Sequence, residues 1–262
     1  MADNVAIMAT GTYMAARRPR LLSHRGEMPG FVENTLGGFR AALAAGADVI
    51  ESDIQVSRDG IPVLFHDDTL VRLTGSPARI CDVTAHELGE MDLGRGEGVP
   101  TLEAALSSLP HALFNLDVKS PTSPEVATSV IRSLNAESRV LLASFSERNR
   151  RTVKRLLPGV AASASSSLFV RILIADRFGM KRQVRRLTRQ IDAVQIPTRG
   201  AGMNLTHRSF IARLHEAGVE VHFWVINEPQ EIRRLLDACA DGLVTDDVVT
   251  ARRVIDMWLA ER

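Results

Sequence analysis

Short apolar runs alternate with longer amphipathic segments from Leu21 to the C-terminus. Short apolar runs bounded by turn residues are typical of buried strands, whereas apolar positions spaced by three and four residues are typical of helices. The alternation predicts repeated strand–helix units and a parallel sheet. The predicted strands cover residues 20–24, 49–56, 113–118, 139–144, 160–164, 192–196, 220–225 and 241–245. Eight such units favour a single-domain α/β fold, the (β/α)₈ TIM barrel.

One piece interrupts this order after the second strand. Asp59 and Gly60 form a turn signal between two strand-like runs, so residues 61–67 are expected to return as a hairpin. Residues 68–100 are rich in glycine and are expected to form a small excursion beside the barrel mouth. Residues 1–19 are interpreted as a flexible lead-in, so that the barrel domain covers residues 20–262.

The composition narrows the classes of function. The chain has 262 residues, of which 45% are hydrophobic, enough for one large core. Lys and Arg number 32 and Asp and Glu 31, so the formal net charge of +1 gives no reason to expect a nucleic acid as partner. The two cysteines, Cys81 and Cys239, indicate neither a disulfide framework nor a zinc site and fit a cytoplasmic location. No apolar run of the sequence is long enough for a transmembrane segment.

A basic segment near the middle of the chain has the pattern of an amphipathic helix. Its stripe consists of Lys181, Arg182, Arg185, Arg186 and Arg189, and the opposite face is apolar. The segment is interpreted either as a solvated outer helix of the barrel or as a site of peripheral contact, through residues 181–189, with anionic lipid or a partner. No pattern indicates the oligomeric state.

Acidic side chains converge on the predicted barrel interior. Side chains of a barrel strand alternate between the interior and the surrounding helices, so Glu51 and Asp53 share one inner face. By the same alternation, Asn115, Asp117 and Lys119 point inward from the next parallel strand. Carboxylates packed together repel one another, and a hard divalent cation neutralises them through oxygen ligands. We therefore expect one Mg²⁺, Ca²⁺ or Mn²⁺ ion; ordinary salt bridges at strand ends are the alternative interpretation.

Two histidines lie where the active sites of such barrels assemble. His24 ends the first predicted strand and His66 ends the predicted hairpin. An imidazole can donate a proton to an alkoxide leaving group or take one from a nucleophile. Arg25 offers a planar fork for phosphate oxygens, and Lys119 offers a point charge. The other histidines are interpreted as ordinary surface or core residues.

The stretch from Ser23 to Leu70 closely resembles the glycerophosphodiester phosphodiesterase family. Its spaced motifs are His-Arg-Gly at 24–26, Glu-Asn-Thr at 33–35, Gly-Ala-Asp at 46–48, Glu-x-Asp at 51–53, Asp-Gly at 59–60 and His-Asp at 66–67. Weaker echoes continue at 100–106, 115–119, 144–146, 203–206, 224–227 and 240–247. The resemblance thus covers nearly all of the chain after residue 20, and it too implies a TIM barrel.

The resemblance also implies roles for individual residues. The implied acid/base pair is His24 and His66, and the implied phosphate-binding residues are Arg25 and Lys119. The implied metal ligands are Glu51, Asp53 and Asp117. At the third ligand this chain has aspartate where the family usually has glutamate, as the related sphingomyelinase D phospholipases also do. The shorter side chain requires either a metal closer to the strand or a water in its shell.

Three further residues are implied around the mouth of the site. Glu33 is an acceptor that either orients Arg25 or approaches the metal, and Asn34 can hydrogen-bond the phosphate or its ligands. Of these two we rank Glu33 higher. Trp224 resembles the aromatic wall against which the family holds the substrate alcohol, with barrel packing as the alternative.

The function implied by the resemblance is metal-dependent hydrolysis of a small glycerophosphodiester to sn-glycerol 3-phosphate and an alcohol. Two alternatives are open from the sequence. One is a lysophospholipase D, for which the basic segment and residues 68–100 would supply lipid contact. The other is a non-catalytic barrel that binds phosphate or a head group, against which the intact histidines and carboxylates argue.

Overall fold

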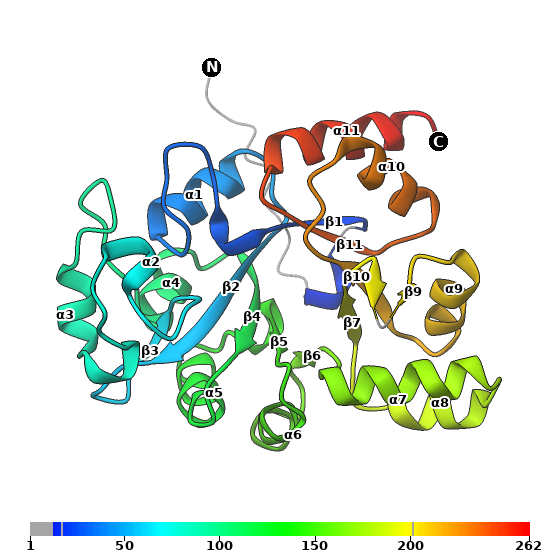
Figure 1. Cartoon of the computed structure of the whole chain (residues 1–262), viewed down its shortest axis with the longest axis horizontal. Coiled ribbons are helices and arrows are strands. Elements are labelled where there is room, and N and C mark those ends of the chain that lie inside the picture. Colours follow the sequence, from blue (N-terminus) through cyan, green and yellow to red (C-terminus); the bar gives the residue numbers. More distant parts are fainter. Residues whose placement is uncertain (1–12, 17, 201) are drawn as a thin grey trace.

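The structure, a computed structural model, describes residues 13–16, 18–200 and 202–262. Eight parallel strands are hydrogen-bonded in the order β6-β5-β4-β2-β1-β11-β10-β7 (Figure 1). A parallel bridge between Ser163 and Ala193 brings β6 next to β7 and nearly closes the barrel. The eight strands are β1 (Arg20–Ser23), β2 (Val49–Val56), β4 (Leu113–Val118), β5 (Val140–Ala143), β6 (Ala161–Ala162), β7 (Ala193–Ile196), β10 (Glu220–Phe223) and β11 (Gly242–Thr245). The predicted TIM barrel is confirmed.

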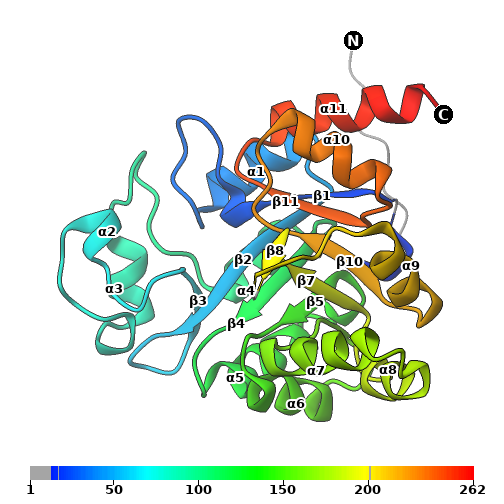
Figure 2. The same cartoon turned by 45° about the vertical axis from the view of Figure 1, so that its right-hand side comes forward.

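Helices on the outside of the barrel follow the strands in turn (Figure 2). Thr35, Thr101, Ser146 and Ser165 each begin one of these helices, because the side-chain oxygen accepts a hydrogen bond from a backbone N–H of the first turn. The helices are α1 (Leu36–Ala44), α4 (Leu102–Ser108), α5 (Ser123–Ser133), α6 (Glu147–Leu156), α7 (Ser166–Arg177), α8 (Lys181–Thr188), α9 (Arg208–Glu216), α10 (Pro229–Asp237) and α11 (Val248–Ala260). Within the described residues, no helix has the length and apolarity needed to cross a membrane.

The alternation of side chains along the strands divides the core into two layers. Outward residues such as Ile50, Ile54 and Leu116 pack against the helices in the largest cluster of buried residues. Inward residues near the strand beginnings, including Leu22 and Val49, fill the barrel floor. The inner face near the strand ends is therefore left for polar side chains, as the alternation predicts.

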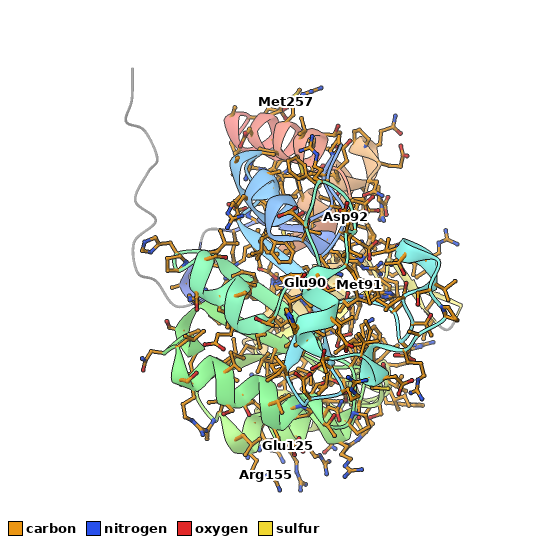
Figure 3. All side chains as sticks on the ribbon, turned by 90° about the vertical axis from the view of Figure 1, so that its left-hand side faces the viewer. Glu90, Met91, Asp92, Glu125, Arg155 and Met257 are labelled. Atoms are coloured by element: carbon orange, nitrogen blue, oxygen red, sulfur yellow. The ribbon has the colours of Figure 1, made fainter. Side chains whose placement is uncertain are left out.

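The predicted hairpin and excursion lie where expected after β2. Strand β3 (Pro62–Leu64) pairs antiparallel with β2, and the excursion then forms α2 (Val71–Thr74), a 3₁₀ turn (Ile80–Asp82) and α3 (Ala85–Glu90). Figure 3 views the molecule from this side, with Glu90, Met91 and Asp92 labelled on the excursion. Phe65, Leu70 and Leu88 belong to a separate small core, so the excursion packs as a unit beside the barrel.

The expected lead-in lies partly outside the described residues, since residues 1–12 and 17 are not described. The described part of this segment contacts the barrel. Tyr13 is only 1% exposed and packs with the residues of the barrel floor. Its ring lies 5.4 Å from the guanidinium of Arg20, which also forms an ion pair with Glu220 inside the barrel. Residues 13–16 therefore belong to the floor of the barrel in the structure.

A short two-stranded ribbon completes the fold between β7 and α9. Strand β8 (Arg199–Gly200) pairs antiparallel with β9 (Met203–Asn204). The ribbon stands beside the barrel mouth, because Gly200 at its edge lines the central cavity.

Candidate active site

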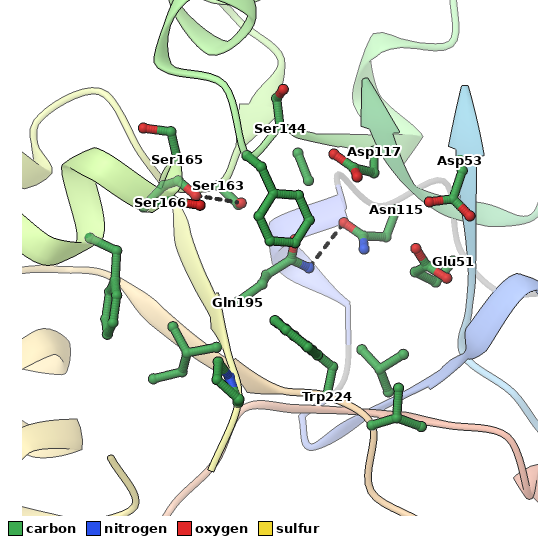
Figure 4. Close-up of a pocket in the computed structure, with 18 of the residues that line it drawn as sticks. Glu51, Asp53, Asn115, Asp117, Ser144, Ser163, Ser165, Ser166, Gln195 and Trp224 are labelled. Carbon is green, nitrogen blue, oxygen red and sulfur yellow. Dashed lines mark hydrogen bonds between the residues drawn. The ribbon is translucent and has the colours of Figure 1, made fainter. Parts of the chain in front are cut away.

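One cavity of about 360 Å³ opens where the parallel strands end. It collects side chains from nearly every strand of the barrel, which is where TIM barrels place their active sites. Eight of the ten residues predicted from the sequence line it: His24, Arg25, Glu51, Asp53, His66, Asp117, Lys119 and Trp224. Figure 4 shows Glu51, Asp53, Asn115 and Asp117 gathered on one side of the cavity, with a group of serines across from them.

The acidic side of the cavity consists of three buried carboxylates. Asp53 of β2 and Asp117 of β4 are direct partners across the two strands, and Glu51 lies one inward position earlier. Burial and the neighbouring charge of Asp53 raise the pKa of Asp117 to about 7. The same two causes raise the pKa of Glu51 well above its usual range. Three carboxylates held this close therefore require positive charge nearby.

Protein cations supply part of that charge. The ammonium Nζ of Lys119 lies 3.0 Å from Oδ1 of Asp53, and Nε of Arg25 lies 3.5 Å from Oδ2 of the same side chain. The backbone N–H of Arg25 donates to Oε2 of Glu51 at 3.0 Å. Arg25 adopts a left-handed backbone conformation with φ of 57°, which turns this N–H toward the carboxylates.

Two carboxylate oxygens of the cluster have no hydrogen-bond partner among the described residues: Oδ2 of Asp53 and Oδ1 of Asp117. Buried acceptors that lack a hydrogen bond fit a further cation in addition to Arg25 and Lys119. Hard oxygen donors are the ligands of Mg²⁺, Ca²⁺ and Mn²⁺. In the part of the chain that the structure describes, however, no three His, Cys, Asp or Glu side chains lie close enough together to form a metal site. The donor chemistry of the three carboxylates fits a hard divalent cation.

Each of the two cavity histidines is held by a carboxylate. Nδ1 of His24 lies 2.6 Å from Oδ1 of Asp246, and the amide of Asn227 donates to the other oxygen of Asp246 at 2.8 Å. Nδ1 of His66 lies 2.6 Å from Oδ1 of Asp67. In both pairs the carboxylate engages Nδ1, and Nε2 of each ring has no hydrogen-bond partner among the described residues.

Arg72 of α2 joins the second of these pairs to the first loop of the barrel. Its Nε donates to Asp67 at 2.7 Å, while its two terminal nitrogens donate to Glu33 at 2.7 and 2.8 Å. Glu33 also accepts a hydrogen bond from Arg25 at 3.2 Å. Despite partial burial, the hydrogen bonds from Arg72 and the charge of Arg25 hold the pKa of Glu33 below its usual range. The excursion therefore contacts the site through one guanidinium.

Two predicted residues are not part of the cavity wall. Glu33 lies behind Arg25, and these contacts favour the interpretation in which it orients the arginine. Asn34 is 1% exposed and accepts a hydrogen bond from the hydroxyl of Ser52 at 2.6 Å. Its side chain faces the outward side of β2, so it anchors the loop in the structure instead of lining the mouth.

Sequence reasoning missed Asp246, Asn227 and Arg72. The family echo at 240–247 includes Asp246, and the His-Asp motif includes Asp67. No local pattern, however, joins Asp246 to His24, which lies 222 positions away.

The wall across from the carboxylates has an apolar and a polar part. Trp224 packs edge-on against Phe145 at 6.3 Å between ring centroids, and Phe169, Leu173 and Leu205 continue this apolar arm. The polar part includes the buried Ser144, Ser163 and Ser165, and Gln195, which donates to Asn115 at 3.0 Å. Of this wall, the sequence analysis named only Trp224 as a site residue, although the family echo at 144–146 includes Ser144 and Phe145.

Comparisons with known proteins place this site in a family. The sequence model of the glycerophosphoryl diester phosphodiesterase family matches residues 24–250. A probable glycerophosphodiester phosphodiesterase 2 of Mycobacterium tuberculosis is 36% identical over 223 residues, which cover 85% of this chain and 84% of that protein. A human lysophospholipase D is 23% identical over 261 residues, covering 86% of this chain and 82% of its own. Among solved structures, an Oleispira antarctica phosphodiesterase in complex with the product sn-glycerol-3-phosphate has a TM-score of 0.76 at 23% identity, covering 91% of this chain and 97% of that one. The chain is therefore an enzyme of the glycerophosphoryl diester phosphodiesterase family.

Proposed function

We propose that this enzyme hydrolyses glycerophosphodiesters to sn-glycerol 3-phosphate and an alcohol. The observation that carries the proposal is one cavity lined by two carboxylate-paired histidines and by a buried acidic cluster with Arg25 and Lys119 beside it. The name of the Mycobacterium tuberculosis relative supports the same reaction. We propose further that Glu51, Asp53 and Asp117 hold one divalent cation. Such a cation, when bound, supplies a Lewis acid that polarises a phosphoryl oxygen.

The residues of the chain would divide the reaction as follows. Arg25 and Lys119 bind non-bridging phosphate oxygens and offset the charge that develops on them. One of His24 and His66 donates a proton to the leaving alkoxide as the phosphorus–oxygen bond breaks, and the other takes a proton from the attacking hydroxyl. The attacking hydroxyl belongs either to water or to the substrate glycerol, and the second route passes through a cyclic phosphate. Trapping of that cyclic product in the first turnovers would distinguish the two routes.

The first experiment measures release of glycerol 3-phosphate from a panel of glycerophosphodiesters with Mg²⁺, Mn²⁺, Ca²⁺ or EDTA. Release by the wild type should depend on metal and should be lost in Glu51→Ala. Glu125→Ala, which removes an exposed glutamate of α5, is the matched control and should keep full turnover. Equal turnover with EDTA, or in Glu51→Ala, would contradict the proposed role of the acidic cluster.

The histidines are tested in the same assay. His24→Ala and His66→Ala should each lower kcat/KM by at least about 100-fold, because each removes a proton-transfer group. His86→Ala, an exposed histidine of α3, provides the control and should be unaffected. Near-normal turnover in both cavity variants would refute the acid/base assignment. Tight phosphodiester binding without turnover by the wild type would move the assignment to a binding barrel.

A second candidate, lysophospholipase D activity, is favoured by the apolar arm of the cavity. A small glycerophosphodiester has no apolar group that would pack against Phe169, Leu173 and Leu205, whereas the acyl chain of a lysolipid would. The human relative named lysophospholipase D supports this candidate as well. Faster release of choline from lysophosphatidylcholine than from glycerophosphocholine would favour it. The contact of residues 181–189 with anionic lipid belongs to this second candidate, and a cytoplasmic location stays a prediction.

A further inference from the structure

Helix α7 exposes large apolar side chains on the side that faces solvent. Val170 and Ile174 are each 50% exposed, and Phe178 at the C-cap is 76% exposed. Because the three are spaced by four residues, they lie along one side of the helix and its end. We name Val170, Ile174 and Phe178 the apolar ridge. Of the large hydrophobic side chains in the described part of the chain, Phe178 is the most exposed, so burial in the core of one molecule does not account for it.

The apolar ridge is continuous with the mouth of the cavity. Val170 itself lines the cavity, and so do Phe145 and Val225, which are 64% and 36% exposed. We name Phe145, Val170 and Val225 the apolar rim. From the rim, the apolar surface continues inward along the arm that contains Phe169. An exposed apolar patch that leads into a site of chemistry marks a surface that meets an apolar partner during function.

Positive charge surrounds the ridge. The segment 166–189 holds seven basic residues and one acidic residue, a net charge of +6 in a chain whose formal net charge is +1. The single acid, Asp176, pairs with Arg213 of α9. The seven basic side chains have no ion-pair partner among the described residues. Arg171 and Arg177 each lie three positions from Ile174, so they flank the ridge on the helix surface.

The same positive charge continues onto the neighbouring helix. Helices α7 and α8 lie side by side in both overall views (Figures 1 and 2). Lys181 and Arg182 begin α8 directly after the turn that holds Phe178, and both are exposed. The tip of this helical hairpin therefore combines an exposed aromatic ring with a cluster of cations. Apolar area and basic charge together are the two signals that hold a protein on an anionic bilayer.

We propose that the apolar ridge and rim dock on an anionic phospholipid surface, with the mouth of the cavity turned toward the lipid. On this geometry the lysolipid of the second candidate function reaches the cavity directly from the lipid surface, with its acyl chain in the apolar arm and its phosphodiester at the histidines. The substrate half of the inference rests on the proposed phosphodiesterase function, whereas the docking half does not. A second copy of the chain is the rival occupant, but it would bring seven more unpaired cations against the first seven.

The docking half is tested by flotation of the full chain with phosphatidylcholine vesicles, with and without phosphatidylglycerol. The wild type should float with the anionic vesicles. Ile174→Glu/Phe178→Glu should lower the partition coefficient by at least about ten-fold, because it replaces the two most lipid-facing side chains with charge. The matched control, Val249→Glu/Met257→Glu, changes two exposed apolar residues of α11, which are 48% and 58% exposed, and should float like the wild type.

A second pair of substitutions tests the charge. Arg171→Gln/Arg177→Gln should reduce binding to the anionic vesicles by about five-fold for each charge removed, and high salt should remove the difference. Failure of the wild type to float, or equal flotation of the ridge variant, would overturn the docking proposal. Light scattering that shows a wild-type dimer dissolved by Ile174→Glu/Phe178→Glu would assign the ridge to a second copy and overturn it too.

The substrate half is tested by turnover of two substrates in the same ridge variant. Ile174 and Phe178 do not line the cavity, so turnover of soluble glycerophosphocholine should equal that of the wild type. Turnover of lysophosphatidylcholine presented in anionic vesicles should fall about as much as the partition coefficient. An equal rate on the vesicle substrate would overturn the substrate class. Failure of the phosphodiesterase function itself would appear separately, as absence of turnover of either substrate by wild-type enzyme that still floats.

Discussion

Among single residues, Asp246 offers the sharpest test of how the histidines are held. The hydrogen bond from His24 keeps the pKa of Asp246 below its usual range, so the side chain is an ionised acceptor at neutral pH. Asp246→Asn keeps the size of the side chain but replaces the charged acceptor with an amide. Because Asp246 is not part of the cavity wall, kcat should fall by about 10- to 100-fold while KM stays near that of the wild type. Steady-state kinetics on glycerophosphocholine measure both.

The neighbouring aspartate is a natural control. Asp247 caps α11 by accepting a hydrogen bond from the backbone N–H of Thr250 at 3.0 Å, and asparagine caps helices equally well. Asp247→Asn should therefore leave both kinetic constants and the melting temperature unchanged. An equal loss of kcat in Asp246→Asn and Asp247→Asn would mean that both substitutions shift the loop after β11. That result would contradict a specific role of Asp246 in holding His24.

The same residue shows where sequence reasoning ends. Alternation along one strand was enough to place Glu51 and Asp53 in the cavity, because the contact depends on the strand alone. The pair His24–Asp246 spans 222 positions and exists only because β11 lies beside β1 in the sheet. Glu33 and Asn34 were expected in the mouth and lie outside its wall, since loop conformation decides their direction and no periodicity encodes it.

Among the elements, the excursion acts on the site through α2. Arg72 holds Asp67 and Glu33 at once, and these carboxylates in turn hold His66 and Arg25. Arg72→Gln should therefore lower kcat/KM by roughly 5- to 50-fold through two displaced side chains. The unfolding free energy should change by less than about 1 kcal/mol, since the Arg72 side chain is 45% exposed and its ion pairs are partly screened by solvent.

Arg79→Gln is the control for Arg72→Gln. Arg79 is also an arginine of the excursion but, unlike Arg72, it makes no ion pair with a described residue. Kinetics and urea denaturation are measured on both variants. A loss of stability in Arg72→Gln that matches the loss of activity would show that α2 only supports the excursion, without positioning the site.

The boundaries of a strand were predictable from the sequence where both faces of the strand are buried. Strands β2 and β4 begin and end at the predicted residues, because both are interior strands of the sheet and nearly every one of their side chains is buried. Helices α2 and α3 were not foreseen, since four and six residues are too few for a helical period to stand out from a glycine-rich loop. The location of the excursion was nevertheless predictable from the Asp-Gly turn before it.

For the whole molecule, the floor of the barrel is the feature that composition and periodicity did not reveal. A barrel of eight strands leaves an interior that side chains must fill. Here Arg20 and Glu220 form an ion pair within it, and His222 lies 3.0 Å from the same carboxylate. The buried ring of Tyr13 lies 5.4 Å from the guanidinium of Arg20. A segment interpreted as a lead-in therefore supplies part of the barrel core.

Tyr13 allows this role to be measured. Tyr13→Ala removes a fully buried ring and should lower the free energy of unfolding by about 3–5 kcal/mol. Tyr13→Phe should cost less than about 1 kcal/mol, because the hydroxyl has no hydrogen-bond partner among the described residues. Urea denaturation at neutral pH compares the two variants with the wild type. If Tyr13→Ala were as stable as Tyr13→Phe, the floor would not depend on this segment, and the domain would begin at residue 20 as the sequence alone predicts.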